Sequence, residues 1–99
     1  MALVTTRELL DEAVASGTAV GAFNVVHLET AEALATGAEQ AGLPLILQIS
    51  QNCIRFHGQS EPIVTATLAV ARASSARLSV HLDHIEDARL VDEGIELGV

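Results

Sequence analysis

The regular alternation of short apolar runs with longer segments of helical periodicity is the feature that most constrains the fold of this chain. Apolar runs of strand length occupy residues 19–26, 45–49 and 77–82. Around them, apolar residues recur at helical spacing, which predicts helices over residues 5–16, 28–40, 60–74 and 86–97. The polar stretch 50–59 is predicted to be a loop. Strands that alternate with helices favour an α/β fold with parallel strands and right-handed crossovers.

Local signals add detail to these assignments. The run 45–49 is apolar with hardly any alternation, which is typical of a parallel strand buried on both faces. The run 19–26 is likewise predicted to be a buried strand. At the start of the first helix, Thr5 and Glu8 have the spacing of a capping box, in which each side chain satisfies a free backbone N–H.

The length of the chain limits the architectures that these elements can build. Its 99 residues suit one domain of ordinary size and fall far short of the roughly 250 residues of a closed (β/α)8 barrel. On periodicity alone, a small doubly wound sheet and part of a (β/α)8 barrel fit equally well.

Composition argues against several classes of function. The net charge of −8, with five cationic residues and two aromatic ones, disfavours binding to nucleic acid. No apolar run approaches the about 20 residues of a membrane span, and the first residues are too polar for a signal peptide, so no membrane role is expected. The lone Cys53 excludes a disulfide framework and fits a reducing, cytoplasmic location. The sequence contains no lysine, which excludes Schiff-base chemistry on a carbonyl.

Polar residues lie at the end of each of the three apolar runs, in the segments 23–27, 48–52 and 81–84. In parallel α/β folds the functional groups gather at the carboxyl ends of the strands, so these segments hold the candidates, among them Asn24, Ser50, Asp83 and His84. The segment 81–84, His-Leu-Asp-His, is the richest of the three. A histidine beside a carboxylate suits metal binding and acid–base chemistry. The alternative is that Asp83 caps the following helix while the histidines are solvated. Similarly, Asn24 could bind a substrate or its own loop, and Ser50 could donate to a phosphate or cap the strand end.

The residues at the strand ends resemble a known family. The segments Gly-Ala-Phe-Asn-Val at 21–25, Pro-Leu-Ile-Leu-Gln-Ile-Ser at 44–50 and His-Leu-Asp-His at 81–84 are similar, in order and spacing, to the N-terminal part of class II, metal-dependent fructose-bisphosphate aldolases and their ketose-bisphosphate relatives. The similarity runs over residues 9–99. One departure is Ile85, since many relatives have glycine there.

The resemblance implies a fold and a set of roles. Residues 1–99 would form the N-terminal part of a single (β/α)8 barrel domain, with an extra first helix and three βα units, and would stop before the fourth strand. By resemblance, Asp83 is the catalytic acid/base and His84 is the first zinc ligand, while Ser50 and Asn24 bind the substrate. The zinc ion would polarise the ketone oxygen and stabilise the enediolate in place of the absent lysine.

The function implied by the resemblance belongs to a whole enzyme. That enzyme would reversibly cleave fructose 1,6-bisphosphate, a sugar phosphate, into dihydroxyacetone phosphate and glyceraldehyde 3-phosphate, with tagatose bisphosphate or another ketose bisphosphate as alternatives. A catalytic zinc site needs about three protein ligands. Because only His84 is carried over, the isolated chain is expected to be inactive. A homo-oligomer is expected, and the alternatives are a non-catalytic partial-barrel assembly module and a doubly wound domain that binds another ligand.

Overall fold

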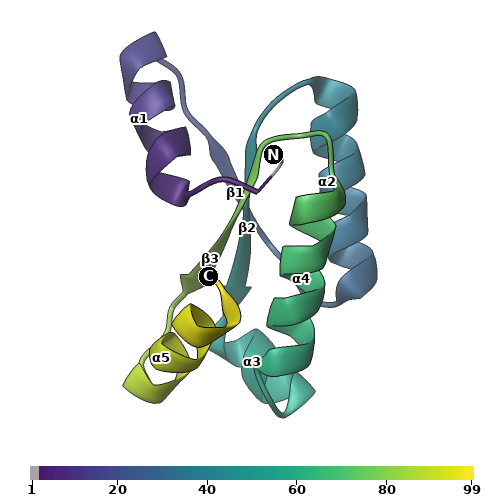
Figure 1. Cartoon of the computed structure of the whole chain (residues 1–99), viewed down its shortest axis with the longest axis vertical. Helices are drawn as coiled ribbons and strands as arrows, with labels where there is room; N and C mark the ends of the chain where they lie inside the picture. Colours follow the sequence, from purple (N-terminus) through teal and green to yellow (C-terminus); the bar gives the residue numbers. More distant parts are fainter. Residues whose placement is uncertain (1–2) are drawn as a thin grey trace.

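A computed structural model describes residues 3–99 of the chain (Figure 1). Within this range the elements are α1 (Thr6–Ser16), β1 (Gly21–Asn24), α2 (Leu28–Ala41), β2 (Leu45–Ser50), α3 (Gln51–His57), α4 (Glu61–Ala73), β3 (Leu78–Asp83) and α5 (Ala88–Leu97). The predicted helices and strands are present, with one additional helix, α3, where a loop was predicted.

The three strands form one parallel sheet in the order β1-β2-β3. The register aligns Phe23 with Leu47 and Leu47 with Val80. Helical crossovers therefore connect β1 to β2 and β2 to β3, and α5 follows β3, as in successive βα units. The prediction of an α/β fold with parallel strands is confirmed.

One face of the sheet carries the hydrophobic core. In Figure 1, α2 and α4 lie side by side over this face. The buried residues that meet there are Leu47, Ile49, Leu78 and Val80 from the strands and Ala31, Ala35, Val64, Leu68 and Ala71 from the helices. The small alanine side chains let α2 pack closely on the sheet, which explains why so much of the apolar content is alanine.

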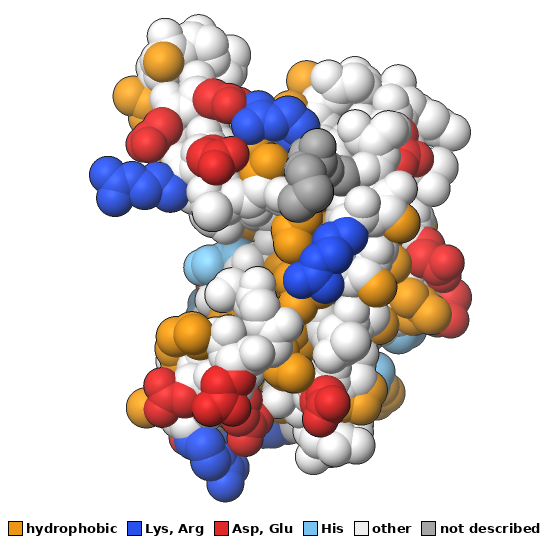
Figure 2. Space-filling view, in the orientation of Figure 1, with side chains coloured by type: hydrophobic (Ala, Val, Ile, Leu, Met, Phe, Trp, Pro, Cys, Tyr) orange, Lys and Arg blue, Asp and Glu red, His pale blue; other side chains and the backbone are white. Residues whose placement is uncertain are grey.

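The opposite face of the sheet becomes polar toward its carboxyl end. Side chains alternate along a strand, so Gln48 and Ser50 point away from the core that Leu47 and Ile49 occupy. Near the amino end α1 approaches this face, where the Thr6 hydroxyl donates to Ser79 Oγ at 2.9 Å. Figure 2 shows a recess between α1 and α5, and the residues that line it include His81.

Two predictions about local structure are wrong. The run 19–26 was predicted to be a buried strand, but only Gly21–Asn24 is a strand and all four residues are exposed. Because β1 is an edge strand that pairs only with β2, Phe23 stays 52% exposed. The predicted loop 50–59 instead contains α3, which is anchored in the core by the buried Ile54.

The helices of the described residues are not of the membrane-spanning kind. None of those within residues 3–99 is both long enough and apolar enough to cross a bilayer.

The N-terminal helix begins as its sequence predicts, since Thr5 is the N-cap and its hydroxyl accepts from the Glu8 N–H at 3.1 Å. This contact is one half of the predicted capping box.

Candidate active site

The three strand ends bring the predicted site residues to one end of the polar face. Asn24 is aligned with Gln48 in the sheet register, and Ser50 is aligned with Asp83. Aligned residues on neighbouring parallel strands point to the same face and lie about 4.8 Å apart in the backbone. His84 follows Asp83 directly. Asn24, Ser50, Asp83 and His84 thus lie at the same end of the sheet, and we call them the polar cluster.

A hydrogen bond between strands lies beneath this cluster. His81 Nδ1 is 3.1 Å from Gln48 Oε1, and both side chains are half-buried. Because an amide oxygen only accepts, the imidazole carries its hydrogen on Nδ1 in this contact. The sequence places His81 on the same side of its strand as Asp83, but neither His81 nor Gln48 was assigned a role, although each lies two residues before a predicted site residue and so points to the same face.

Asp83 and His84 form the central pair of the site. Asp83 Oδ2 is 2.6 Å from His84 Nδ1, with side-chain exposures of 25% for the carboxylate and 85% for the imidazole. β3 ends at Asp83, and His84 has a φ of 53°, in the left-handed region. The chain therefore turns immediately after the carboxylate, which allows two consecutive residues to share one site.

The same hydrogen bond prepares the imidazole for metal binding. A carboxylate that engages one ring nitrogen of a histidine orients the ring and leaves the other nitrogen as a possible ligand. Nδ1 of His84 is occupied in this way, so Nε2 is the nitrogen that could bind a metal. Among residues 3–99 no group of three or more His, Cys, Asp or Glu side chains is arranged to hold a metal ion. The pair therefore fits a metal centre as one ligand with its orienting carboxylate, and the described residues do not complete the ligand set.

Ser50 lies where β2 passes directly into α3. It is the N-cap of α3, and its Oγ accepts from the Cys53 N–H at 3.1 Å. The predicted capping alternative is therefore present in the structure. This contact uses one acceptor position of the hydroxyl, and the hydroxyl hydrogen can still be donated to another oxygen.

The alternative role for Asp83 as a helix cap is wrong. The N-cap of α5 is Asp87, whose Oδ1 accepts from the Arg89 N–H at 3.0 Å. Asp83 is the last residue of β3, and its carboxylate bonds His84 instead. Its carboxylate is therefore free of a capping role.

Cys53 does not join the polar cluster as a nucleophile. Burial raises the pKa of its thiol, so the neutral S–H form predominates at neutral pH. Its Sγ lies 3.5 Å from the carbonyl oxygen of Val26, in the loop after β1. The thiol therefore lies between α3 and the loop after β1, against the hydrophobic core.

A sheet of parallel βα units whose polar strand ends meet at one edge is the architecture of enzymes built on the (β/α)8 barrel. Residues 4–99 match the protein family described as fructose-bisphosphate aldolase class-II. The chain belongs to this family. The observed α1 and the three βα units that follow it are consistent with part of such a barrel.

Individual relatives agree with this assignment. The chain is 35% identical to a fructose-bisphosphate aldolase of Thermus caldophilus over 83% of its length, and 31% identical to a sulfofructosephosphate aldolase of Alkalicoccus urumqiensis over 99%. The crystal structure of the YdjI aldolase from Escherichia coli K12 superposes with a TM-score of 0.87 at 20% identity, over 98% of this chain and 38% of that one. The chain spans 26% of the Thermus protein and 34% of the Alkalicoccus protein.

Proposed function

We propose that this chain supplies the N-terminal part of a class II aldolase barrel, residues 1–99 of a single (β/α)8 domain that continues with a fourth strand. The observation that carries the proposal is the Asp83–His84 pair at the carboxyl end of β3. The pair combines a carboxylate that can transfer a proton with an imidazole that can bind a metal ion. Metal-dependent aldol cleavage of a sugar phosphate uses both functions.

Asp83 is the proposed acid/base. Its side chain is 25% exposed, so a substrate can reach it, while its bond to His84 restricts its rotamer. It would accept or return a proton on the hydroxyl oxygen beside the bond that breaks. A positioned general acid/base contributes about 10²–10⁴-fold to a rate.

His84 is the proposed metal ligand, and zinc is the proposed metal. Zinc held by His84 would supply Lewis acidity for the carbonyl group of the substrate. The sequence lacks the lysine that would activate this carbonyl through a Schiff base. Because a catalytic zinc takes about three protein ligands, the others would come from barrel segments beyond the described residues.

Asn24 and Ser50 are the proposed substrate contacts. Both lie at the same end of the polar face as Asp83, and the Ser50 hydroxyl has a hydrogen available for a phosphate oxygen. Fructose 1,6-bisphosphate is the proposed substrate. Because one relative is named as a sulfofructosephosphate aldolase, other ketose phosphates are the alternatives. Tagatose bisphosphate is one of them.

The experiment that tests the proposal is a substitution at Asp83 in the full-length product of the gene that contains this chain. Asp83→Ala should lower the rate of fructose 1,6-bisphosphate cleavage by about 10²-fold or more. Asp87→Ala is a matched control, because it removes a neighbouring carboxylate that caps α5 and pairs with Arg89 but bonds neither Asp83 nor His84. A rate for Asp83→Ala within a few fold of the wild type contradicts the proposed role.

One observation favours a second candidate, a non-catalytic partial-barrel module that assembles with other chains. The strand β1 exposes all four of its residues and has an unpaired edge in the described sheet, and open edges promote association. A stable homo-oligomer of the 99-residue chain by sedimentation, with no zinc-dependent cleavage by any longer product, would favour this candidate. A homo-oligomeric enzyme in the cytoplasm is the corresponding prediction for the aldolase.

A further inference from the structure

We propose that Gln51 is a positioning residue that fixes the turn carrying His84. The inference rests on the proposed function, because the turn matters for catalysis only if His84 binds the metal. Gln51 is not one of the proposed site residues, and it lies on another element, as the first residue of α3. Within the described residues its side chain bonds the turn after His84 and not His84 itself.

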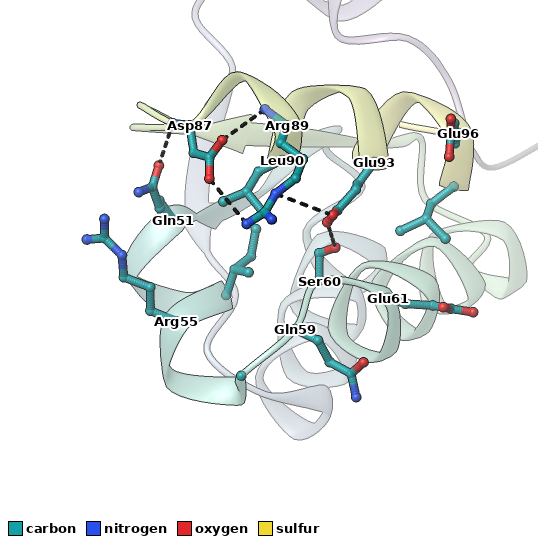
Figure 3. A pocket seen from close by; sticks show the side chains of 13 residues that line it. Gln51, Arg55, Gln59, Ser60, Glu61, Asp87, Arg89, Leu90, Glu93 and Glu96 are labelled. Carbon is teal, nitrogen blue, oxygen red and sulfur yellow. Dashed lines mark hydrogen bonds and ion pairs between the residues drawn. The ribbon is translucent and has the colours of Figure 1, made fainter.

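The contact is a double hydrogen bond from one side-chain oxygen. Gln51 Oε1 lies 2.6 Å from the backbone nitrogen of Glu86 and 3.1 Å from that of Asp87. Both partners are N–H donors, so the carbonyl end of the amide must face them. Gln51 is only 6% exposed, and hydrogen bonds shielded from water are stronger than exposed ones. Figure 3 shows its side chain pointing from α3 to the start of α5.

The turn needs such a support because of its backbone conformation. His84 has a φ of 53°, which a side chain with a Cβ adopts only at a cost and which persists only where the surroundings enforce it. On one side the turn is fixed by the pairing of Asp83 with Ser50 in the sheet. On the other side the Gln51 carbonyl holds residues 86 and 87, so the direction of His84 is set between two anchors.

The same helix also holds the loop on the other side of β2. His57, at the end of α3, places Nε2 at 2.6 Å from the carbonyl oxygen of Val26, just after β1. Gln51 and His57 thus link the loops that follow β3 and β1, respectively, to a helix that begins directly after Ser50. The helix α3 therefore follows β2 and holds the loops that follow the other two strands.

The hollow beside Gln51 offers no competing explanation. It lies between α3, the start of α4 and α5, and three of its charged side chains, Asp87, Arg89 and Glu93, pair among themselves (Figure 3). The Ser60 hydroxyl donates to Glu93 at 2.7 Å, and Arg89 lies 3.5 Å from Asp87 and 3.9 Å from Glu93. The Ser60 contact ties α5 to α4, the Arg89 contacts lie within α5 and its N-cap, and none of them uses the Gln51 carbonyl.

The first part of the test measures amide hydrogen exchange in the full-length protein, resolved to single residues. In the wild type, the amides of Glu86 and Asp87 should be protected. Gln51→Met keeps the length of the side chain and removes the acceptor, so exchange at these two amides should become at least tenfold faster. Gln51→Glu keeps an acceptor oxygen and should restore protection. Gln59→Met, at an exposed glutamine on the rim of the same hollow, is the matched control and should change neither amide.

Unprotected Glu86 and Asp87 amides in the wild type contradict the contact without any variant, even if Gln51→Met fails to fold. Equal exchange in the wild type and a folded Gln51→Met protein also contradicts it, as does a failure of Gln51→Glu to restore protection.

The second part measures zinc affinity by competition with a chelator in the same proteins. Loss of a group that orients a metal ligand typically weakens binding 10–100-fold. Gln51→Met should therefore bind zinc at least tenfold more weakly, and Gln51→Glu should bind it as the wild type does. Unchanged affinity in Gln51→Met contradicts the positioning role. If the amides are protected but the wild type binds no zinc, the contact is present and the proposed function is contradicted. Gln51 then has no role in positioning a metal ligand.

Discussion

The carboxylate of Asp83 and the imidazole of His84 are neighbours in the sequence and also in the site, with Oδ2 and Nδ1 2.6 Å apart. Consecutive residues of a strand normally point to opposite faces. The two side chains meet here because β3 ends at Asp83 and the backbone of His84 is left-handed, with a φ of 53°. A proton-transfer group and a metal ligand can therefore come from one dipeptide.

This relationship predicts different losses for the two residues. His84→Ala removes a proposed ligand and should abolish stoichiometric zinc binding by the full-length protein. Asp83→Asn keeps an oxygen near Nδ1 but removes the charge, so zinc affinity should fall by about 10–100-fold while turnover falls further. Zinc titration and cleavage rates on both variants provide the check. Loss of turnover in Asp83→Asn that only matches its loss of zinc would mean that the carboxylate acts solely by orienting His84.

The packing of α5 on β3 predicts a cost for adding a methyl group at Gly94. A Cβ at this buried position would overlap the side chain of Leu82. Gly94→Ala should therefore lower the free energy of unfolding by about 1–3 kcal/mol.

Gly37→Ala is the matched control for that substitution. Gly37 is also helical, but it is exposed and has open space around it. Alanine there should raise stability by about 0.5–1 kcal/mol, because glycine is unfavourable inside a helix. Denaturant midpoints of the two variants measure both effects, and a Gly94→Ala protein as stable as Gly37→Ala would mean that α5 does not pack as described.

The ion pair between α1 and the start of β3 predicts a small dependence of stability on pH. The Arg77 guanidinium hydrogen-bonds Glu12 and holds the pKa of that carboxyl below its ordinary value of 4.5. A carboxyl with a lowered pKa in the folded state stabilises the protein above its ordinary pKa, and this contribution is lost as the pH falls through the lowered value. Unfolding measured between neutral pH and acid should thus show a shallower decline for Glu12→Gln than for the wild type. Because the pair is exposed, the difference should shrink in high salt.

The environment of Cys53 predicts slow thiol chemistry. Burial raises the pKa of the thiol, so less thiolate is available at neutral pH than in an unfolded chain. Iodoacetamide should modify the folded protein more slowly than the protein in urea at the same pH. Equal rates in the two conditions would contradict the half-buried placement of Cys53.

Most of the fold could be predicted from hydrophobic periodicity, because most core residues lie on helices and strands that short stretches of sequence already predict. Leu47 and Val80 lie on strands that their apolar runs predict, and Ala31 and Ala35 lie on the predicted face of a helix. The exposure of Phe23 could not be predicted, since it depends on whether a strand has neighbours on both sides.

The sequence was sufficient to predict which residues lie at the site, but not the helix and the hydrogen bonds that hold them in place. Asn24, Ser50, Asp83 and His84 are polar residues at or near the ends of apolar runs, and the structure places them at one end of the sheet. The short helix α3 was missed because its sequence is polar and only Ile54 enters the core. The hydrogen bonds of Gln51 join positions 35 and 36 residues apart, and local patterns carry no information about such contacts.

The most direct test of the account is metal removal from the full-length protein, followed by its return. After treatment with a chelator, cleavage of fructose 1,6-bisphosphate should stop, and added zinc should restore it in the wild type but not in His84→Ala. Cleavage at the full rate after complete removal of metal would contradict the account, because the account assigns the Lewis acidity of the site to a metal ion held by His84.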